Sequence, residues 1–228
     1  MSRFQPSPSQ IATARARDLE AQGRKIVKLT AGEPDFPTPR HVKQAILDAM
    51  EMNNTKYTPI NGTIAMREAV SAKFARENGL AYGMDQITVG AGTKQILFNC
   101  LMASVGPGDE VVIPAPYWTS YPDIVKIAGG TPVAVACGQN QAFKMRPEQL
   151  EEAITPATKW LILSSPNNPS GATYTADDLR AFAAVLAKHP QVWVLTDDVY
   201  EHLLFDGRAF ATIAQAAPEM YERTITCN

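Results

Sequence analysis

The chain has 228 residues, of which 45% are hydrophobic and 19% are charged, a composition typical of a globular protein with one or two domains. The formal net charge is −2, and the basic and acidic residues are interspersed, which argues against binding to nucleic acid or a membrane surface. No apolar run approaches the roughly 18 residues of a membrane span, and the N-terminal MSRFQPSPSQ lacks the apolar core of a signal peptide. We therefore expect a cytoplasmic protein.

The three cysteines, Cys100, Cys137 and Cys227, lie far apart in apolar surroundings, and the three histidines are scattered. No CxxC or HExxH pattern occurs. We interpret the cysteines as small buried side chains in a reducing compartment, and we expect no metal site.

The first third of the chain is predicted to be helical, with helices over Ile11–Gln22, residues 39–52 and residues 63–78. Three prolines between residues 34 and 39 make the connection before the second helix a stiff loop. Thr38 and Pro39 suit the start of that helix, and Gly79 suits the end of the third.

From residue 87 onward, strands and helices alternate. Helices are predicted over residues 94–105, 118–128, 147–154 and 176–188, and strands over 87–89, 110–113, 131–136, 159–164, 192–196 and 224–227. This alternation predicts an α/β protein with three layers, in which a mostly parallel sheet is covered by helices on both faces.

In such a sheet, ligands bind beyond the carboxyl ends of the strands. Four loops follow predicted strands there: GAGTK (90–94), PAPYW (114–118), SSPNNPSG (164–171) and DDVY (197–200). We expect them to converge on one edge.

The first two loops offer an anion site and an aromatic surface. Gly90, Gly92 and Thr93 lead into a helix, whose free amides attract an anion; the alternative is a plain glycine-rich turn. Trp118 offers a flat face for a planar ring; the alternative is an aromatic that covers the top of the core.

The last loop offers a carboxylate and a phenol. Asp197 ends a very apolar strand, where a carboxylate needs a partner such as a cationic heterocycle nitrogen; the alternative is a helix cap or a surface turn. Tyr200 could present its hydroxyl to the same ligand or pack under the loop. A phosphate cradle, an aromatic surface, a carboxylate and polar donors together describe a site for pyridoxal 5′-phosphate.

Six motifs carry a resemblance that extends from about residue 25 to the end: LTAGEPDFPTP (29–39), KYTPING (56–62), GAGTKQ (90–95), PGDEVVIPAPYWTSYPD (107–123), SSPNNPSG (164–171) and DDVYEHLLFDG (197–207). With them the chain resembles the class I/II aminotransferases, which are fold-type-I pyridoxal-phosphate enzymes, and most of all the bacterial aspartate aminotransferase branch. The resemblance implies transamination of an amino acid with a 2-oxo acid, with aspartate and 2-oxoglutarate as the preferred pair. A lyase or synthase of the same fold, and a non-catalytic cofactor pocket, are the alternatives.

The resemblance also implies roles for residues at the cofactor. Gly92, Thr93 and Lys94 match the turn that cradles the phosphate, and Trp118 matches the aromatic that stacks on the ring. Asn168 matches the asparagine that hydrogen-bonds the phenolate oxygen. Asp197 is similar to the partner of the pyridinium nitrogen, and Tyr200 to the tyrosine that shares the phenolate.

Further roles are implied at the substrate and at a neighbouring subunit. Gly32 matches the glycine whose backbone meets the substrate α-carboxylate, and Trp118 and Asn168 border the same substrate. Lys94 matches a lysine that helps to recognise a distal carboxylate, although it could equally be a solvated charge at a helix start. Tyr57 resembles the tyrosine that reaches the phosphate of the neighbouring subunit, which implies a homodimer.

The family pattern continues, after the equivalent of residues 226–228, with a Ser-Lys pair and a Gly-Trp-Arg segment. The chain stops at Asn228, so we expect an N-terminal fragment without the Schiff-base lysine and two substrate- and phosphate-binding arginines. Residues 1–38 would be the arm and the start of the small domain, and residues 39–228 an incomplete large domain. We expect no transamination by this chain alone. We also expect a missing sheet neighbour for residues 87–89, an unpaired edge at 224–227, and low stability of the isolated fragment.

Overall fold

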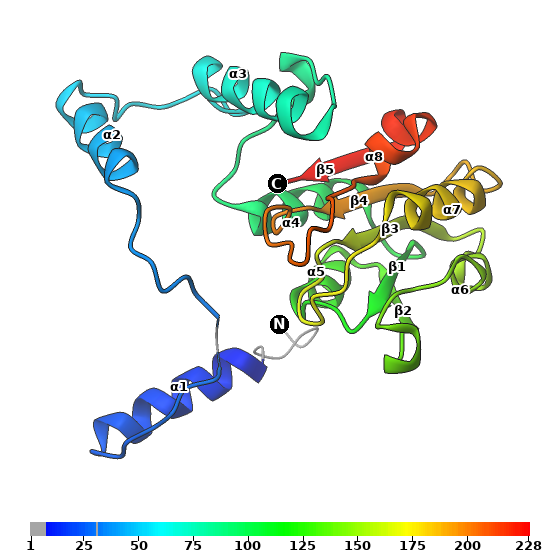
Figure 1. Ribbon diagram of the computed structural model, residues 1–228, viewed down its shortest axis with the longest axis horizontal. Coiled ribbons are helices and arrows are strands. Elements are labelled where there is room, and N and C mark those ends of the chain that lie inside the picture. Colours follow the sequence, from blue (N-terminus) through cyan, green and yellow to red (C-terminus); the bar gives the residue numbers. More distant parts are fainter. Residues whose placement is uncertain (1–7, 31) are drawn as a thin grey trace. The chain divides into compact units, whose positions relative to one another are not determined.

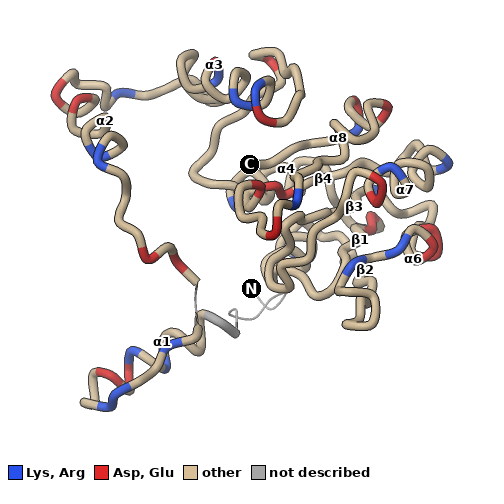
Figure 2. Tube along the Cα trace, in the orientation of Figure 1, with Lys and Arg blue, Asp and Glu red and all other residues tan. Residues whose placement is uncertain are grey.

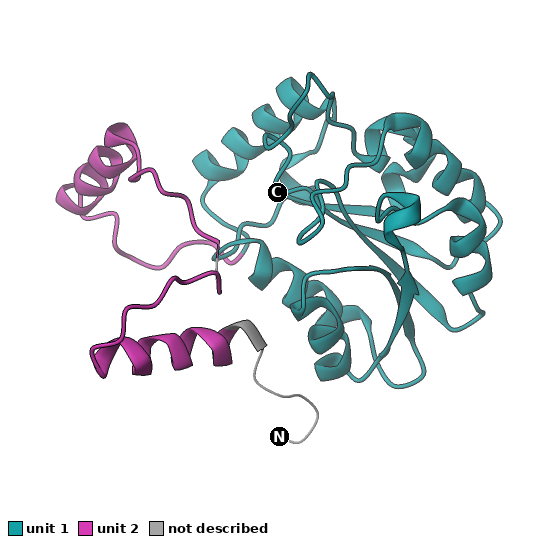
Figure 3. Cartoon of the chain, turned by 60° about the horizontal axis from the view of Figure 1, so that its bottom comes forward, with its two compact units in different colours: residues 1, 3, 61–228 teal, residues 2, 4–60 magenta. Residues whose placement is uncertain are grey.

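The computed structural model describes residues 8–30 and 32–228 (Figure 1). Residues 61–228 form one compact unit, and the described residues before Asn61 belong to a second (Figure 3). The domain boundary expected after residue 38 rests on the resemblance and stays a prediction. Basic and acidic residues are interspersed along the described chain (Figure 2), and none of the described helices is long and apolar enough to cross a membrane.

The described part of the smaller unit contains two helices, α1 (Pro8–Ala21) and α2 (Arg40–Glu51). Both confirm the predicted helices to within a few residues. Gly23 follows α1 with a φ of 81° and ends it, because glycine adopts this left-handed backbone without a side-chain clash. No residue of α2 is buried.

The larger unit begins with α3 (Ile64–Lys73), which continues as a wider helical turn over Phe74–Asn78. The Thr63 side chain accepts a hydrogen bond from the Met66 backbone N–H at 3.3 Å, so it caps the first turn. Gly79 closes the turn with a φ of 65°. This confirms the helix predicted over residues 63–78.

Within residues 8–30 and 32–228, five parallel strands form the sheet in the order β2-β1-β3-β4-β5. Their bounds are β1 (Glu110–Ala115), β2 (Thr131–Ala136), β3 (Thr158–Ser164), β4 (Trp193–Asp197) and β5 (Thr224–Cys227). The helices that alternate with them are α4 (Thr93–Ser104), α5 (Ser120–Ala128), α6 (Pro147–Ala153), α7 (Ala176–Leu186) and α8 (Ile213–Ala216). The predicted α/β fold is confirmed.

Successive residues of the strands point to opposite faces of the sheet and enter two separate cores. On one face, Val112, Leu161 and Val194 are packed with side chains of α6 and α7. On the other face, Val111 and Ile162 are packed with side chains of α4 and α5. The continuous apolar strands of the sequence therefore reflect a sheet that is buried on both sides.

The prediction of a strand over residues 87–89 is wrong. These residues form no strand, although Ile87 is buried. The described chain supplies no strand beside them, and the Val89 N–H instead donates to the Asn61 carbonyl oxygen at 3.2 Å. A three-residue segment without a neighbouring strand cannot form the hydrogen bonds of a sheet. The unpaired edge expected at residues 224–227 is confirmed, because β5 ends the order and pairs with β4 alone among the described strands.

Candidate functional site

A pocket of about 220 Å³ opens at the carboxyl ends of β3 and β4. Six of the residues predicted from the sequence line it: Thr93, Lys94, Trp118, Asn168, Asp197 and Tyr200. Gly92 directly precedes Thr93 as the N-cap of α4. Gly32 and Tyr57 belong to the smaller unit, and their roles stay predictions. The converging loops thus meet at one edge, where a parallel sheet places its ligands.

One wall of the pocket is the N-terminus of α4. Gly92 has a φ of 81°, and a Cβ built on it would meet nothing within 4 Å, so the backbone there is open to a close approach. The Ala91 N–H donates to the Gln95 side-chain oxygen at 2.5 Å, which fixes the turn before the helix. The first amides of a helix have no intrahelical acceptor and carry partial positive charge. This wall is therefore suited to an anion such as phosphate.

A second wall is the indole of Trp118, which two neighbours hold in place. The Lys94 Nζ lies 4.8 Å from the centroid of the indole ring, within the range of a cation–π contact. The Tyr121 ring meets the indole edge to face, with centroids 5.3 Å apart and an interplanar angle of 85°. The helix start and α5 therefore both contribute to the position of the aromatic wall.

The base of the pocket is the carboxylate of Asp197, which is only 6% exposed. Its Oδ2 accepts a hydrogen bond from the Tyr121 hydroxyl at 2.6 Å. Its Oδ1 is buried and has no hydrogen-bond partner among the described residues. Burial raises the pKa of Asp197, and the Tyr121 hydroxyl and the nearby Val199 backbone oppose that rise only in part. A buried acceptor without a donor is costly, so this oxygen is suited to a ligand that carries an N–H group or a positive charge.

In the loop after β3, Asn167 and Asn168 make different contacts. The Asn167 Nδ2 donates to the Pro116 carbonyl oxygen at 3.0 Å and to the Ser170 hydroxyl at 2.7 Å. Asn167 therefore ties its loop to the loop after β1, while Asn168 lines the pocket. The bond between Asn168 and Pro169 is cis.

The loop after β4 carries Tyr200 and is anchored by the acidic residues on either side. The Asp198 N–H donates to the Cys227 carbonyl oxygen at 2.8 Å, and its carboxylate accepts a hydrogen bond from the Thr196 hydroxyl at 2.6 Å. Complete burial raises the pKa of Asp198 to about 7. Glu201 pairs with the Lys73 ammonium of α3. These contacts fix both ends of the segment that presents Tyr200.

Glu201 also belongs to a group of three side chains, with Glu77 and His202, whose ligand atoms lie within 4.8 Å of one another. The Lys73 ammonium already contacts Glu201, and the Asn78 Nδ2 donates to it at 2.7 Å. Burial raises the pKa of Glu201, but these two partners outweigh it and lower the pKa overall. The group is therefore an ion-pair network that anchors the loop.

Four further residues line the pocket that the motif analysis did not assign: Leu97, Tyr121, Ser164 and Val199. Tyr121 could have been found from its spacing, because it follows Trp118 by three residues at the start of a predicted helix, and residues three apart lie on the same side of a helix. Ser164 is the last residue of β3 and lies next to Asp197 in the register of the sheet. Leu97 follows Lys94 by three residues at the start of another predicted helix and carries the same signal, whereas the sequence carries no comparable signal for Val199.

A parallel sheet with a polar pocket at the carboxyl ends of its strands places the chain in the class of α/β proteins, which bind their ligands at this position. Residues 24–228 match the profile of the family described as aminotransferase class I and II, so the chain belongs to this family. It is 54% identical over 228 residues to the aspartate/prephenate aminotransferase of Cereibacter sphaeroides, and this match covers 100% of this chain and 57% of that protein. It is also 54% identical over 215 residues to an aspartate aminotransferase of Rhizobium meliloti, and this second match covers 94% of this chain and 52% of that enzyme.

Two solved structures have the same fold. The aspartate aminotransferase from Rhizobium meliloti matches with a TM-score of 0.92 and 51% identity, over 98% of this chain and 58% of that one. The aspartate aminotransferase from Thermus thermophilus with maleate matches with a TM-score of 0.92 and 44% identity, over 98% and 57%. This chain thus spans a little more than half the length of the relatives that it matches.

Proposed function

We propose that this chain binds pyridoxal 5′-phosphate in the pocket at the carboxyl edge and forms the cofactor-binding part of an aspartate-type aminotransferase. One observation carries the proposal: the buried Oδ1 of Asp197, which has no hydrogen-bond partner in the part of the chain that the structure describes, lies in the same pocket as the N-terminus of α4 and the indole of Trp118. A cationic nitrogen, a phosphate and a flat ring are the three features of this cofactor that such a pocket would accept.

The residues present fit the parts of the cofactor. Gly92, Thr93 and Lys94 would hold the phosphate, and Trp118 would cover the ring. Asp197 would pair with the ring nitrogen and keep a proton on it, because a carboxylate favours the charged form of a nearby base. The cofactor supplies an electron sink at the reacting carbon, and the protein contributes orientation and charge.

Asn168 and Tyr200 would complete the polar contacts of the ring. Both side chains line the pocket, and an amide N–H and a phenol O–H are both donors that a phenolate oxygen can accept. Asn167 keeps the Asn168 loop in position through the Pro116 carbonyl. Gly32 would meet the substrate α-carboxylate, and Tyr57 would serve the phosphate of a partner subunit in a homodimer.

The preferred substrates are dicarboxylic. Lys94 places an ammonium in the pocket, where it can attract a second carboxylate. The names of the relatives support this choice, since they act on aspartate or on aspartate and prephenate, and the Thermus thermophilus structure holds maleate, a dicarboxylate. We therefore propose aspartate as the amino donor and 2-oxoglutarate as the acceptor, with prephenate as the second candidate acceptor.

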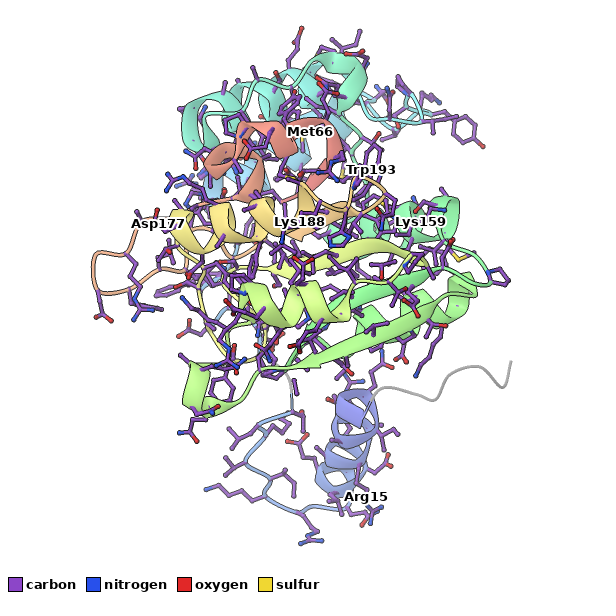
Figure 4. The ribbon with its side chains drawn as sticks, turned by 90° about the vertical axis from the view of Figure 1, so that its right-hand side faces the viewer. Arg15, Met66, Lys159, Asp177, Lys188 and Trp193 are labelled. Carbon is purple, nitrogen blue, oxygen red and sulfur yellow. The ribbon has the colours of Figure 1, made fainter. Side chains whose placement is uncertain are left out.

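The first test is binding of the cofactor to the purified chain. Trp118 is the one tryptophan that lines the pocket, while Trp193 starts β4 at the other end of the strand from Asp197 and is 41% exposed (Figure 4). Titration with pyridoxal 5′-phosphate should quench the fluorescence of the chain. A Trp193→Phe control should keep that quenching and a Trp118→Phe variant should lose most of it. Equal quenching in both variants would count against the site.

The second test is the reaction. Residues 1–228 are compared, in a coupled assay with aspartate and 2-oxoglutarate, with a chimera in which they are followed by the remaining C-terminal part of the Rhizobium meliloti enzyme. We expect turnover from the chimera and none from residues 1–228 alone. With pyridoxal 5′-phosphate at saturating concentration, so that any loss of the Lys94–phosphate contact is masked, a Lys94→Met change in the chimera should raise KM for aspartate about tenfold, the loss of one charge-assisted contact. Under the same conditions it should raise KM for alanine, which has no second carboxylate, much less. A chimera that releases ammonia or a decarboxylated product in place of the amino-group exchange would favour a lyase.

A further inference from the structure

We infer that Tyr121 is a positioning residue that holds the Asp197 carboxylate with one oxygen occupied and the other presented to the pocket. The inference rests on the proposed function, because the ligand of the second oxygen is the cationic ring nitrogen of the cofactor. It concerns a residue to which neither the motifs nor the family resemblance stated above gives a role.

The hydrogen bond between Tyr121 and Asp197 joins a helix that packs on the sheet to a strand of the sheet. Tyr121 lies in the first turn of α5 and Asp197 ends β4. The Tyr121 hydroxyl and the Asp197 Oδ2 are 2.6 Å apart, and Tyr121 is 2% exposed. The same ring packs edge to face on Trp118. One side chain therefore contacts both the base of the pocket and its aromatic wall.

A phenol suits this position for a chemical reason. Burial, and then the charge of Asp197, raise the pKa of the Tyr121 hydroxyl, so it remains a neutral donor and the carboxylate remains the acceptor. An arginine or lysine there would neutralise the carboxylate and compete with a cationic ligand. Because the hydroxyl has one proton, it engages Oδ2 and leaves Oδ1 for the ligand, as the unpartnered state of that atom indicates.

Other charged or titratable groups act on the same carboxylate. Asp198 is its neighbour in sequence and Cys227 is its partner in the register of β5, and both interact electrostatically with it. Lys94 contributes the positive charge from α4 in the same pocket. None of these three donates a hydrogen bond to Asp197 among the contacts of the described residues, so Tyr121 is the side chain that orients it.

The test compares the chain with Tyr121→Phe, which keeps the ring and removes the hydroxyl. The matched control is Tyr174→Phe, another buried tyrosine, whose hydroxyl accepts the Met145 N–H at 2.9 Å outside this pocket. Binding is measured for pyridoxal 5′-phosphate and for its analogue with carbon in place of the ring nitrogen. Tyr121→Phe should weaken the cofactor about tenfold, because the contact between Asp197 and the ring nitrogen, a hydrogen bond to a charged group, is then made by a carboxylate that is no longer held in place, and it should leave the analogue unchanged. Tyr174→Phe should change neither.

The second readout needs no ligand. The carboxyl carbon of Asp197 is titrated by nuclear magnetic resonance in the chain and in Tyr121→Phe. Because the hydroxyl lowers the pKa of Asp197 against the effect of burial, its removal should move the titration midpoint to higher pH. Tyr174→Phe should leave the midpoint in place.

The outcomes separate the inference from the proposed function. An equal loss for cofactor and analogue would mean that Tyr121 only supports the packing, and no loss for either would mean that Asp197 does not need it; both overturn the inference. If the unaltered chain binds no cofactor, the proposed function fails, and the Asp197 titration still decides the role of Tyr121. If Tyr121→Phe does not fold, Tyr121→His retains a ring with an N–H donor and should preserve the preference for cofactor over analogue. Loss of that preference would overturn the inference.

Discussion

Replacement of Asp197 by asparagine should act in opposite directions on cofactor binding and on the stability of the free chain. The substitution keeps the size of the side chain and an oxygen that can still accept the Tyr121 hydroxyl, 2.6 Å away in the unaltered chain. It removes the negative charge at the base of the pocket. A site built for a ligand should lose affinity without losing stability.

The size of the binding effect follows from the unpartnered Oδ1. A hydrogen bond to a charged group contributes about 1.5 to 3 kcal/mol, and about 1.4 kcal/mol corresponds to a factor of ten in affinity. Asp197→Asn should therefore raise the Kd for pyridoxal 5′-phosphate by about 10- to 100-fold. The analogue that lacks the ring nitrogen should bind the variant and the unaltered chain alike.

The sign of the stability effect follows from burial. Burial raises the pKa of Asp197 in the folded chain, so at a pH between the unfolded and the folded pKa the folded state retains a proton that the unfolded state has lost. This carboxyl therefore makes the chain less stable as the pH rises above its unfolded pKa of about 4. At pH 7 the asparagine variant should unfold at an equal or higher urea concentration than the unaltered chain.

The assay is urea unfolding of the chain with and without cofactor, followed by tryptophan fluorescence. Asp85→Asn is the control, since Asp85 is exposed, does not line the pocket and also changes one carboxylate to an amide. The reasoning would be refuted by a variant that binds the cofactor normally. It would also be refuted by one that is clearly less stable than Asp85→Asn in the absence of cofactor, because Asp197 would then serve the fold and not a ligand.

Two more predictions concern the loop that carries Tyr200. Asp198 has a pKa of about 7 because it is buried, so the free energy of unfolding should fall as the pH rises from about 4 to about 7. Asp198→Asn should flatten this pH dependence and add at most about 4 kcal/mol of stability at pH 7. An unchanged pH dependence, measured by urea unfolding at several pH values, would contradict this. Lys73→Met leaves the Glu201 carboxylate, whose side chain is 3% exposed, without its cation and should cost about 3 kcal/mol. The control Lys159→Met breaks the exposed pair with Asp109 and should cost less than about 1 kcal/mol; similar losses in the two variants would show that burial of Glu201 does not decide the effect.

Local sequence patterns were sufficient for most of the helices and strands. The helix start at Thr63 is confirmed by its cap, and Gly23 and Gly79 end their helices with positive φ angles. These are effects of neighbouring residues within one turn of chain, and such effects can be recognised in a sequence. The apolar runs of β3 and β4 likewise indicated strands buried on both faces.

The segment at residues 87–89 shows where local patterns end. Its β-branched residues favour a strand, but a strand exists only if another strand supplies its hydrogen bonds. In the described chain Val89 bonds to Asn61 instead. Strand pairing depends on which other strands the sheet contains, and this cannot be predicted from the three residues alone.

The α/β class, the loops that line the pocket and the family could all be recognised from the amino-acid sequence, because each depends on residue types in fixed order along the chain. The folded chain adds that six of the predicted residues share one pocket and that Tyr121 occupies one oxygen of Asp197. It also shows that the other oxygen is buried, with no hydrogen-bond partner among the residues described. Tyr121 and Asp197 are separated by 76 positions in the sequence. Their hydrogen bond exists because α5 packs on the sheet next to the end of β4, and packing of distant segments is what a one-dimensional pattern does not contain.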